Sequence, residues 1–194
     1  LFGNHSSGKS TFINWYVGRH VCRTGVAIET QGFDVVLSGT RTRTLGGPAT
    51  VELLPWLRGF DAAAPGVLNA LRTDVVDSAE RSFAQLALID SPGLVDGAFT
   101  YAFDVNDALV WLAARCDLVL CFLDPLGQAL CRRTMHVVER LCGAAHAHKL
   151  RFVLGKADDV ASASDRQKVL VQITQVLAQR VPPSVSLAIS TVYV

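Results

Sequence analysis

Apolar segments of two lengths alternate along the second half of the chain. Short, nearly continuous apolar runs indicate buried strands, and longer stretches with helical periodicity indicate amphipathic helices. The predicted strands are 33–37, 83–89, 117–123 and 150–154, and the predicted helices are 105–115, 129–144 and 164–180. Such alternation predicts an α/β fold with a mostly parallel central sheet, helices on both faces, and a ligand at the carboxyl ends of the strands.

The first half of the chain is less regular. Residues 11–17 are apolar enough to form a helix that packs on a sheet, and Gly18 is expected to end it. Residues 19–32 lack periodicity and are predicted to form a loop, while 40–66 contain glycines and prolines that break long elements. Within 53–60, large apolar side chains gather in this irregular context, either packed beneath a long connection or exposed as an interaction surface.

Composition predicts one folded domain spanning residues 1–194. Hydrophobic residues make up 50% of the chain and charged residues 18%, which argues against disorder. A net charge of +1 offers no general attraction to nucleic acid, so no nucleic-acid partner is expected. No apolar run approaches the ~20 residues of a membrane span. Five cysteines without a C-x-x-C pair predict free thiols, and His146 with His148 predicts a surface pair rather than a metal site.

Candidate chemistry begins at the amino terminus. Residues 3–10, GNHSSGKS, match the phosphate-binding loop G-x-x-x-x-G-K-S/T. Its glycines let backbone N–H groups turn toward a phosphate chain, Lys9 reaches the terminal phosphates, and the Ser10 hydroxyl can hold Mg²⁺. Only Leu1 and Phe2 precede the loop and no initiator Met is present, so we expect a fragment whose first strand is truncated. The motif predicts that the chain binds a nucleoside triphosphate.

A second motif, Asp90-Ser91-Pro92-Gly93, directly follows a predicted strand. The Asp90 carboxylate can bind Mg²⁺ directly or through water, and the Gly93 N–H is free to approach a γ-phosphate. The tetrapeptide alone is more often a simple turn. Its position after a strand and downstream of a phosphate loop favours the metal-binding role.

A third motif, Gly155-Lys156-Ala157-Asp158, also follows a strand and fits the base-reading element N/T-K-x-D of GTPases except at its first residue. An ionised Asp158 accepts from two adjacent donors on the Watson–Crick edge of guanine, whereas adenine presents an acceptor there. The motif therefore favours guanine. Gly155 weakens this inference, because glycine lacks the asparagine side chain that braces the phosphate loop.

A threonine that caps the metal is expected in the loop before the strand at 33–37. Thr30 is the preferred candidate because it lies near the end of that loop, and Thr24 is the competitor. For any single loop threonine, a solvated side chain is the default.

With these motifs the chain resembles the nucleotide-binding domain of the dynamin superfamily, and within it most closely the Eps15-homology-domain (EHD) proteins. The long spacing between Lys9 and Asp90, and the pair Pro55-Trp56 within it, resemble an insertion of that family. The resemblance covers nearly the whole chain and runs through 3–13, the Thr30 loop, 90–93 and 151–158.

The resemblance implies a dynamin-type G domain of a mechanochemical hydrolase that binds GTP or ATP with Mg²⁺ and remodels membranes. It places Lys9, Ser6 and Thr30 at catalytic positions, and Ser10, Thr30 and Asp90 at metal positions. Motifs and resemblance together predict that the nucleotide is bound by His5, Ser6, Ser7, Gly8, Lys9, Ser10, Thr11, Asp90, Gly93, Lys156 and Asp158. It further implies self-association through the G domain, and a cytoplasmic location with peripheral attachment to endosomal or plasma membrane through regions outside this sequence.

Several residues depart from the family pattern. His5 stands where dynamins carry a water-orienting glutamine and EHD proteins an aromatic residue, and Leu94 leaves no glutamine after Gly93. EHD proteins use ATP despite a GTPase-like base motif, and Val176 fills the place of their dimer-forming aromatic residue. Two alternatives therefore stand beside a slow hydrolase: a nucleotide-gated scaffold with negligible turnover, and a less favoured P-loop kinase.

Overall fold

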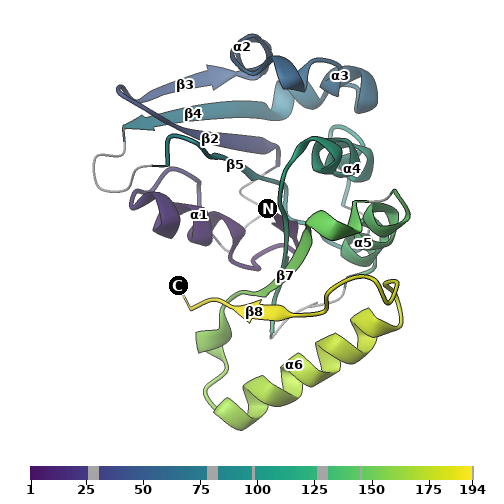
Figure 1. The fold of residues 1–194 in the computed structure, drawn as a ribbon. Helices are drawn as coiled ribbons and strands as arrows, with labels where there is room; N and C mark the ends of the chain where they lie inside the picture. Colours follow the sequence, from purple (N-terminus) through teal and green to yellow (C-terminus); the bar gives the residue numbers. More distant parts are fainter. Residues whose placement is uncertain (26–30, 78–82, 98, 126–130, 145, 194) are drawn as a thin grey trace.

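Strands and helices alternate along the chain in the computed structural model, which describes residues 1–25, 31–77, 83–97, 99–125, 131–144 and 146–193 (Figure 1). The strands are β1 (Phe2–Gly3), β2 (Phe33–Gly39), β3 (Arg43–Gly46), β4 (Leu71–Asp77), β5 (Ala87–Asp90), β6 (Val119–Leu123), β7 (Leu150–Leu154) and β8 (Ile189–Thr191). The α-helices are α1 (Lys9–Val17), α2 (Gly47–Leu53), α3 (Phe60–Ala63), α4 (Val105–Arg115), α5 (Arg132–Gly143) and α6 (Ala163–Ala178). Single 3₁₀ turns are η1 (Pro55–Leu57), η2 (Val67–Ala70), η3 (Ala147–Lys149) and η4 (Ala157–Asp159).

The strands form two four-stranded sheets whose edges meet at the start of the chain. One has the order β1-β6-β7-β8, with every neighbouring pair parallel, and the other has the order β3-β4-β2-β5. In the second sheet β2 and β4 are parallel, whereas β3 and β5 are antiparallel to their neighbours. The Leu1 amino group donates to the Ile89 carbonyl at 2.7 Å, which joins β1 to β5. The predicted mostly parallel α/β sheet is confirmed.

Helices cover both faces of this sheet because successive strand residues point to opposite sides. Val35 belongs to the larger core cluster, which also receives side chains from α4, α5 and α6. Its neighbour Val36 belongs to the smaller cluster, together with Ile13 and Val17 of α1. Figure 1 shows α1 on the side of the sheet away from α4 and α5. Helix α1, which follows the phosphate loop, therefore packs on one face of the sheet, and α4 and α5 pack on the opposite face.

The region between β2 and β5 is more regular than predicted. Residues 40–66 contain β3, α2, η1 and α3, and the strand expected at 83–89 begins only at Ala87. The sequence analysis also missed β4, whose alternation includes Arg72 and Asp74. Arg72 pairs with Asp34 at 3.0 Å on the adjacent strand and with Asp74 at 3.1 Å. Because β4 contains charged residues that are paired within the sheet, its sequence lacks the apolar run by which the other strands were predicted.

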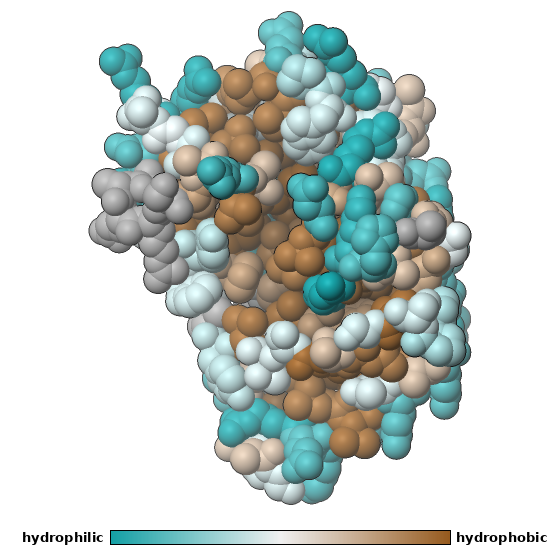
Figure 2. All heavy atoms as spheres, viewed as in Figure 1, coloured by the Kyte–Doolittle hydropathy of each residue, from teal (hydrophilic) through white to brown (hydrophobic). Residues whose placement is uncertain are grey.

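The apolar segment 53–60 divides between packing and exposure. Leu57 and Phe60 are fully buried, and Phe60 stacks on Trp111 of α4 with ring centroids 4.9 Å apart. Trp56 keeps 37% of its surface exposed and Leu53 keeps 39%. Figure 2 shows that apolar side chains also lie open among polar ones on the face that it draws. Packing beneath the insertion accounts for the two largest buried side chains of this segment.

Candidate functional site

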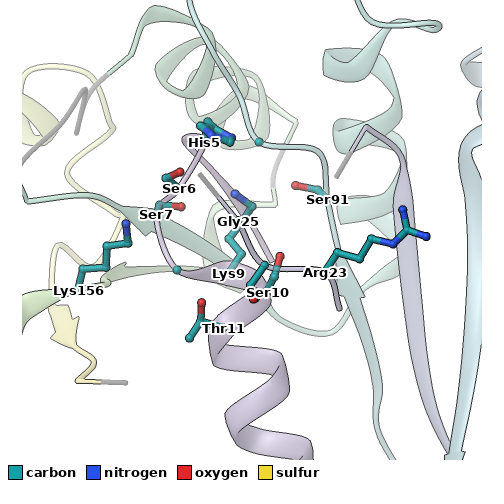
Figure 3. Close-up of a pocket in the computed structure, with 13 residues that line it drawn as sticks. His5, Ser6, Ser7, Lys9, Ser10, Thr11, Arg23, Gly25, Ser91 and Lys156 are labelled. Atoms are coloured by element: carbon teal, nitrogen blue, oxygen red, sulfur yellow. The ribbon is translucent and has the colours of Figure 1, made fainter. Parts of the chain in front are cut away.

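A cavity of about 270 Å³ opens at the phosphate loop (Figure 3). It lies where β1, β5 and β7 end, the edge at which a parallel α/β sheet binds its ligands. Of the predicted nucleotide-binding residues, the ones that line it are His5, Ser6, Ser7, Gly8, Lys9, Ser10, Thr11, Gly93 and Lys156. The structure therefore brings most of the predicted site together.

Backbone geometry explains the glycines of the phosphate loop. A Cβ on Gly3 would lie 2.1 Å from the carbonyl oxygen of Phe122 on the adjacent strand β6, so only glycine fits where the loop leaves β1. Gly8 has φ +92°, a left-handed conformation that glycine adopts without strain, and α1 begins at the next residue. The amino-terminal end of α1 thus faces the cavity, where its free N–H groups and its dipole favour an anion.

Lys9 brings a buried positive charge to the floor of the cavity. Its Nζ donates to the Asn4 carbonyl oxygen at 2.8 Å and to the Gly3 carbonyl oxygen at 3.4 Å. Burial lowers the pKa of Lys9, and the nearby Asp90 carboxylate opposes that shift. Asn4 is held in turn by the Thr134 hydroxyl, which donates to its Oδ1 at 2.5 Å. A phosphate in the cavity offers Nζ stronger acceptors than the two carbonyls, because charge-assisted hydrogen bonds exceed neutral ones.

Ser10 and Asp90 meet behind the loop, as the metal-site prediction requires. The Ser10 hydroxyl donates to Asp90 Oδ2. Asp90 is fully buried, and its second oxygen, Oδ1, has no hydrogen-bond partner among the residues that the structure describes. Desolvation raises the pKa of Asp90, with the Lys9 charge opposing it. A buried carboxylate oxygen without a partner, beside a hydroxyl at a phosphate site, is a donor set that fits Mg²⁺.

Gly93 packs directly on the phosphate loop. A Cβ at this position would lie 2.8 Å from His5 Cα and 3.2 Å from His5 Nδ1. The His5 N–H donates to the Leu94 carbonyl at 2.9 Å, and the Leu94 N–H donates to the Gly3 carbonyl at 3.0 Å. Tyr101 fixes the segment from the other side, since its hydroxyl donates to the Gly93 carbonyl at 2.6 Å. Any ligand that contacts Gly93 therefore also meets His5.

At Gly155, the backbone contacts the phosphate loop directly, where the base motif of GTPases has an asparagine whose side chain braces that loop. A Cβ there would lie 2.1 Å from the Ser7 carbonyl oxygen, so the end of β7 touches the phosphate loop itself. Lys156 has φ +50°, and its Cγ lies 3.9 Å from where a Cβ on Gly8 would be. Its stem therefore lies over the loop, as the base motif requires. Asp158 is exposed in η4, two residues further on, and does not line the cavity.

Replacing Gly155 by alanine is expected to displace the phosphate loop. The new methyl group would overlap the Ser7 carbonyl, and relief of such overpacking costs about 1–3 kcal/mol of stability. Thermal unfolding and a nucleotide titration measure the two effects, and we expect both stability and affinity to fall. Gly143→Ala is the matched control, because no atom lies within 4 Å of a Cβ there. Equal behaviour of the two variants would contradict the close approach.

Four described residues line the cavity without being among the predicted nucleotide-binding residues: Arg23, Thr24, Gly25 and Ser91. Thr24, the competitor for the metal-capping role, is among them, whereas Thr30 lies outside the described residues. The signal that could have found the loop residues is Asn14. Its Oδ1 accepts from the Val21 and Cys22 N–H groups at 2.9 and 2.8 Å, which turns the chain back toward the cavity after α1.

All five cysteines are free thiols. Within the described ranges, no group of three or more His, Cys, Asp or Glu side chains is arranged to hold a metal ion. None of the helices described in the structure is long and apolar enough to cross a membrane.

The α/β sheet, the phosphate loop before α1, and the Ser10–Asp90 pair define a P-loop nucleotide-binding domain. The chain is 28% and 29% identical over 169 residues to EH domain-containing proteins 2 and 1 of Arabidopsis thaliana, which covers 82% of this chain and 30% of either relative. It spans about a third of their length. No family model matches the chain.

Solved structures show the same fold. A bacterial dynamin from an oligomerised pair superposes with a TM-score of 0.64 at 15% identity, covering 98% of this chain and 32% of that one. A dimerization-deficient mutant of Toc33 from Arabidopsis thaliana gives 0.53 at 16% identity, covering 99% and 67%. The chain is thus similar in sequence to the EH domain-containing proteins, and its fold is that of dynamin-like and Toc33 nucleotide-binding domains.

Proposed function

We propose that this domain binds a nucleoside triphosphate with Mg²⁺ and hydrolyses its terminal phosphate bond. The observation that carries the proposal is the meeting of three separate motifs at one cavity. Lys9 and Ser10 come from the phosphate loop, Asp90 ends β5 with Gly93 shortly after it, and Lys156 follows β7. Chance motifs would have no reason to converge on one edge of the sheet.

The chain's own residues suit phosphoryl transfer to water. The phosphate-loop N–H groups and Lys9 would hold the β- and γ-phosphates, and Ser10 with Asp90 would hold Mg²⁺, which neutralises phosphate charge when bound. The water oxygen forms a bond to the γ-phosphorus while the bridging P–O bond breaks. Diphosphate and inorganic phosphate result, and the water's proton passes to phosphate or solvent. Ser6 and His5 lie at the cavity beside Gly93, where they can contact the transferring group.

The base site favours GTP and leaves ATP as the second candidate. Lys156 lies over the phosphate loop, and Asp158 follows it in a turn where its carboxylate is open to a ligand. A carboxylate at this point accepts two hydrogen bonds from guanine. The backbone contact between Gly155 and Ser7 supplies the bracing for which other GTPases use asparagine.

We infer a role at a membrane from the relatives. A protein with the same fold is described as an oligomerised bacterial dynamin that senses and tethers membranes. For this chain we propose self-association through the G domain, and peripheral attachment to an endosomal or plasma membrane from the cytoplasm. That attachment would use regions beyond the domain, since the chain matches about a third of its curated relatives.

A nucleotide-gated scaffold with negligible turnover is the second candidate. Leu94 occupies the position after Gly93 where some GTPases carry their catalytic glutamine, and it is 1% exposed. An apolar, buried side chain there cannot orient a water. Triphosphate could then order the segment around Gly93 without being cleaved efficiently.

Phosphate release separates the two candidates. The purified domain is mixed with Mg²⁺ and either GTP or ATP, with and without anionic liposomes, and inorganic phosphate is followed over hours. Turnover with one nucleotide supports the hydrolase and identifies the base. Binding by calorimetry without phosphate release in any mixture supports the scaffold, and absence of binding contradicts both.

A further inference from the structure

The loop between α1 and the described start of β2 places a third basic side chain at the cavity. The described residues that line the cavity include Lys9, Lys156 and Arg23, and none of those described residues is acidic. Lys9 already donates to a phosphate-loop carbonyl, and Lys156 belongs to the motif expected to bind the base. Arg23 is exposed, and no hydrogen bond or ion pair among the described residues engages its guanidinium. Arg23 thus adds an exposed positive charge to the lining of the proposed anion site.

Asn14 determines where Arg23 stands. Its Nδ2 donates to the Cys22 carbonyl at 2.8 Å and lies 2.9 Å from His20 Nδ1, while its Oδ1 accepts from two loop N–H groups. One helical side chain therefore fixes residues 20–22 through four contacts. Cys22 is also buried, so both the contacts of Asn14 and the packing of Cys22 hold the backbone next to Arg23 in place. A loop residue whose side chain only met solvent would not require a backbone fixed by these Asn14 contacts.

Arg23 lines the cavity, and rotation about its side-chain bonds changes the direction in which its guanidinium points. In Figure 3 its guanidinium points away from Lys9, toward the neighbouring strands. Exposed side chains change rotamer on the picosecond-to-nanosecond scale, so the anchored backbone leaves the side chain free to turn inward. Guanidinium offers a planar set of donors that matches phosphate oxygens and keeps its charge at all relevant pH values.

We propose that Arg23 neutralises the charge that develops as the bond to the γ-phosphate breaks. The inference rests on the proposed hydrolase function. As the bridging P–O bond lengthens, its electron pair and negative charge move to the leaving diphosphate, where a guanidinium adds to the charge stabilisation that Lys9 and the phosphate-loop N–H groups provide. The lack of a glutamine at Leu94 makes an added electrostatic contribution more important for turnover. A residue that acts mainly in the transition state changes kcat more than binding.

The test compares wild type with Arg23→Ala, Arg23→Lys and Arg19→Ala. Arg19 is an exposed cation of the same loop that does not line the cavity, so it controls for loss of charge. We expect Arg23→Ala to lower kcat about 10²- to 10³-fold, with the dissociation constant of a non-hydrolysable triphosphate changed about threefold or less. Lysine should restore only part of the rate because it lacks the planar fork.

A second readout is independent of turnover. Diphosphate with aluminium fluoride mimics the transferring phosphate, and Arg23→Ala should weaken its binding far more than that of the triphosphate analogue. Equal weakening of both ligands, or a kcat equal to that of Arg19→Ala, would overturn the role of Arg23. Absence of phosphate release by the wild type would instead contradict the proposed hydrolase.

Discussion

Replacing Lys9 by alanine is expected to weaken triphosphate binding by at least about 100-fold. Nζ is buried at the cavity floor and would exchange its two carbonyl partners for phosphate oxygens. Hydrogen bonds to charged groups contribute about 1.5–3 kcal/mol each, and every 1.4 kcal/mol is a factor of about ten in affinity. Calorimetric titration with GTP, and separately with ATP, measures the loss.

Lys149→Ala is a close control for this variant. Lys149 Nζ also donates to backbone carbonyls, those of Ala113 and Ala114 at the end of α4, at 3.5 and 3.1 Å. Lys149 itself belongs to η3 and does not line the cavity. Both variants lose a similar kind of contact, and thermal unfolding shows whether each remains folded. Nucleotide affinity should fall in Lys9→Ala alone. A folded Lys9→Ala protein that keeps its affinity would remove the phosphate-loop assignment.

Asp90→Asn is expected to have the second large effect, a loss of turnover. The amide has the shape of the carboxylate but lacks the negative charge that binds Mg²⁺, so we expect kcat to fall about 10²- to 10³-fold. The buried Oδ1 without a partner is the atom whose loss of charge matters most. Titration of the nucleotide with and without Mg²⁺ provides a second measurement. The increase in affinity that Mg²⁺ gives the wild type should largely disappear in the variant.

Asp74→Asn is the matched control, because it removes a carboxylate from β4 of the same sheet, at a residue that does not line the cavity. Asp74 accepts from the Thr44 hydroxyl at 2.5 Å and pairs with Arg72. Its replacement should leave kcat and the Mg²⁺ dependence within about threefold of wild type, the scale of a partly exposed ion pair. If Asp90→Asn behaved like Asp74→Asn in these assays, Asp90 would not be a metal ligand.

Elements with strong local signals could be predicted from the sequence. The predicted strand 150–154 and helix 105–115 coincide with β7 and α4, because apolar runs and helical periodicity reflect burial directly. The phosphate loop was equally readable, since Gly3 and Gly8 are required by backbone geometry that no other residue adopts there. Strand β4 was not predicted because it contains the charged residues Arg72 and Asp74, and the partner of Arg72 across the sheet, Asp34, lies far away in the sequence.

By itself, the sequence determined the class of the protein and the motifs that make its site, because their spacing depends on local chain geometry. Only the tertiary structure decided how the motifs meet. It placed Ser10 against Asp90, Gly93 against His5, and Gly155 against Ser7, contacts between residues far apart in the chain. It also brought Arg23 to the cavity, since a loop's position depends on the side chain that anchors it, here Asn14, and not on the loop's own composition.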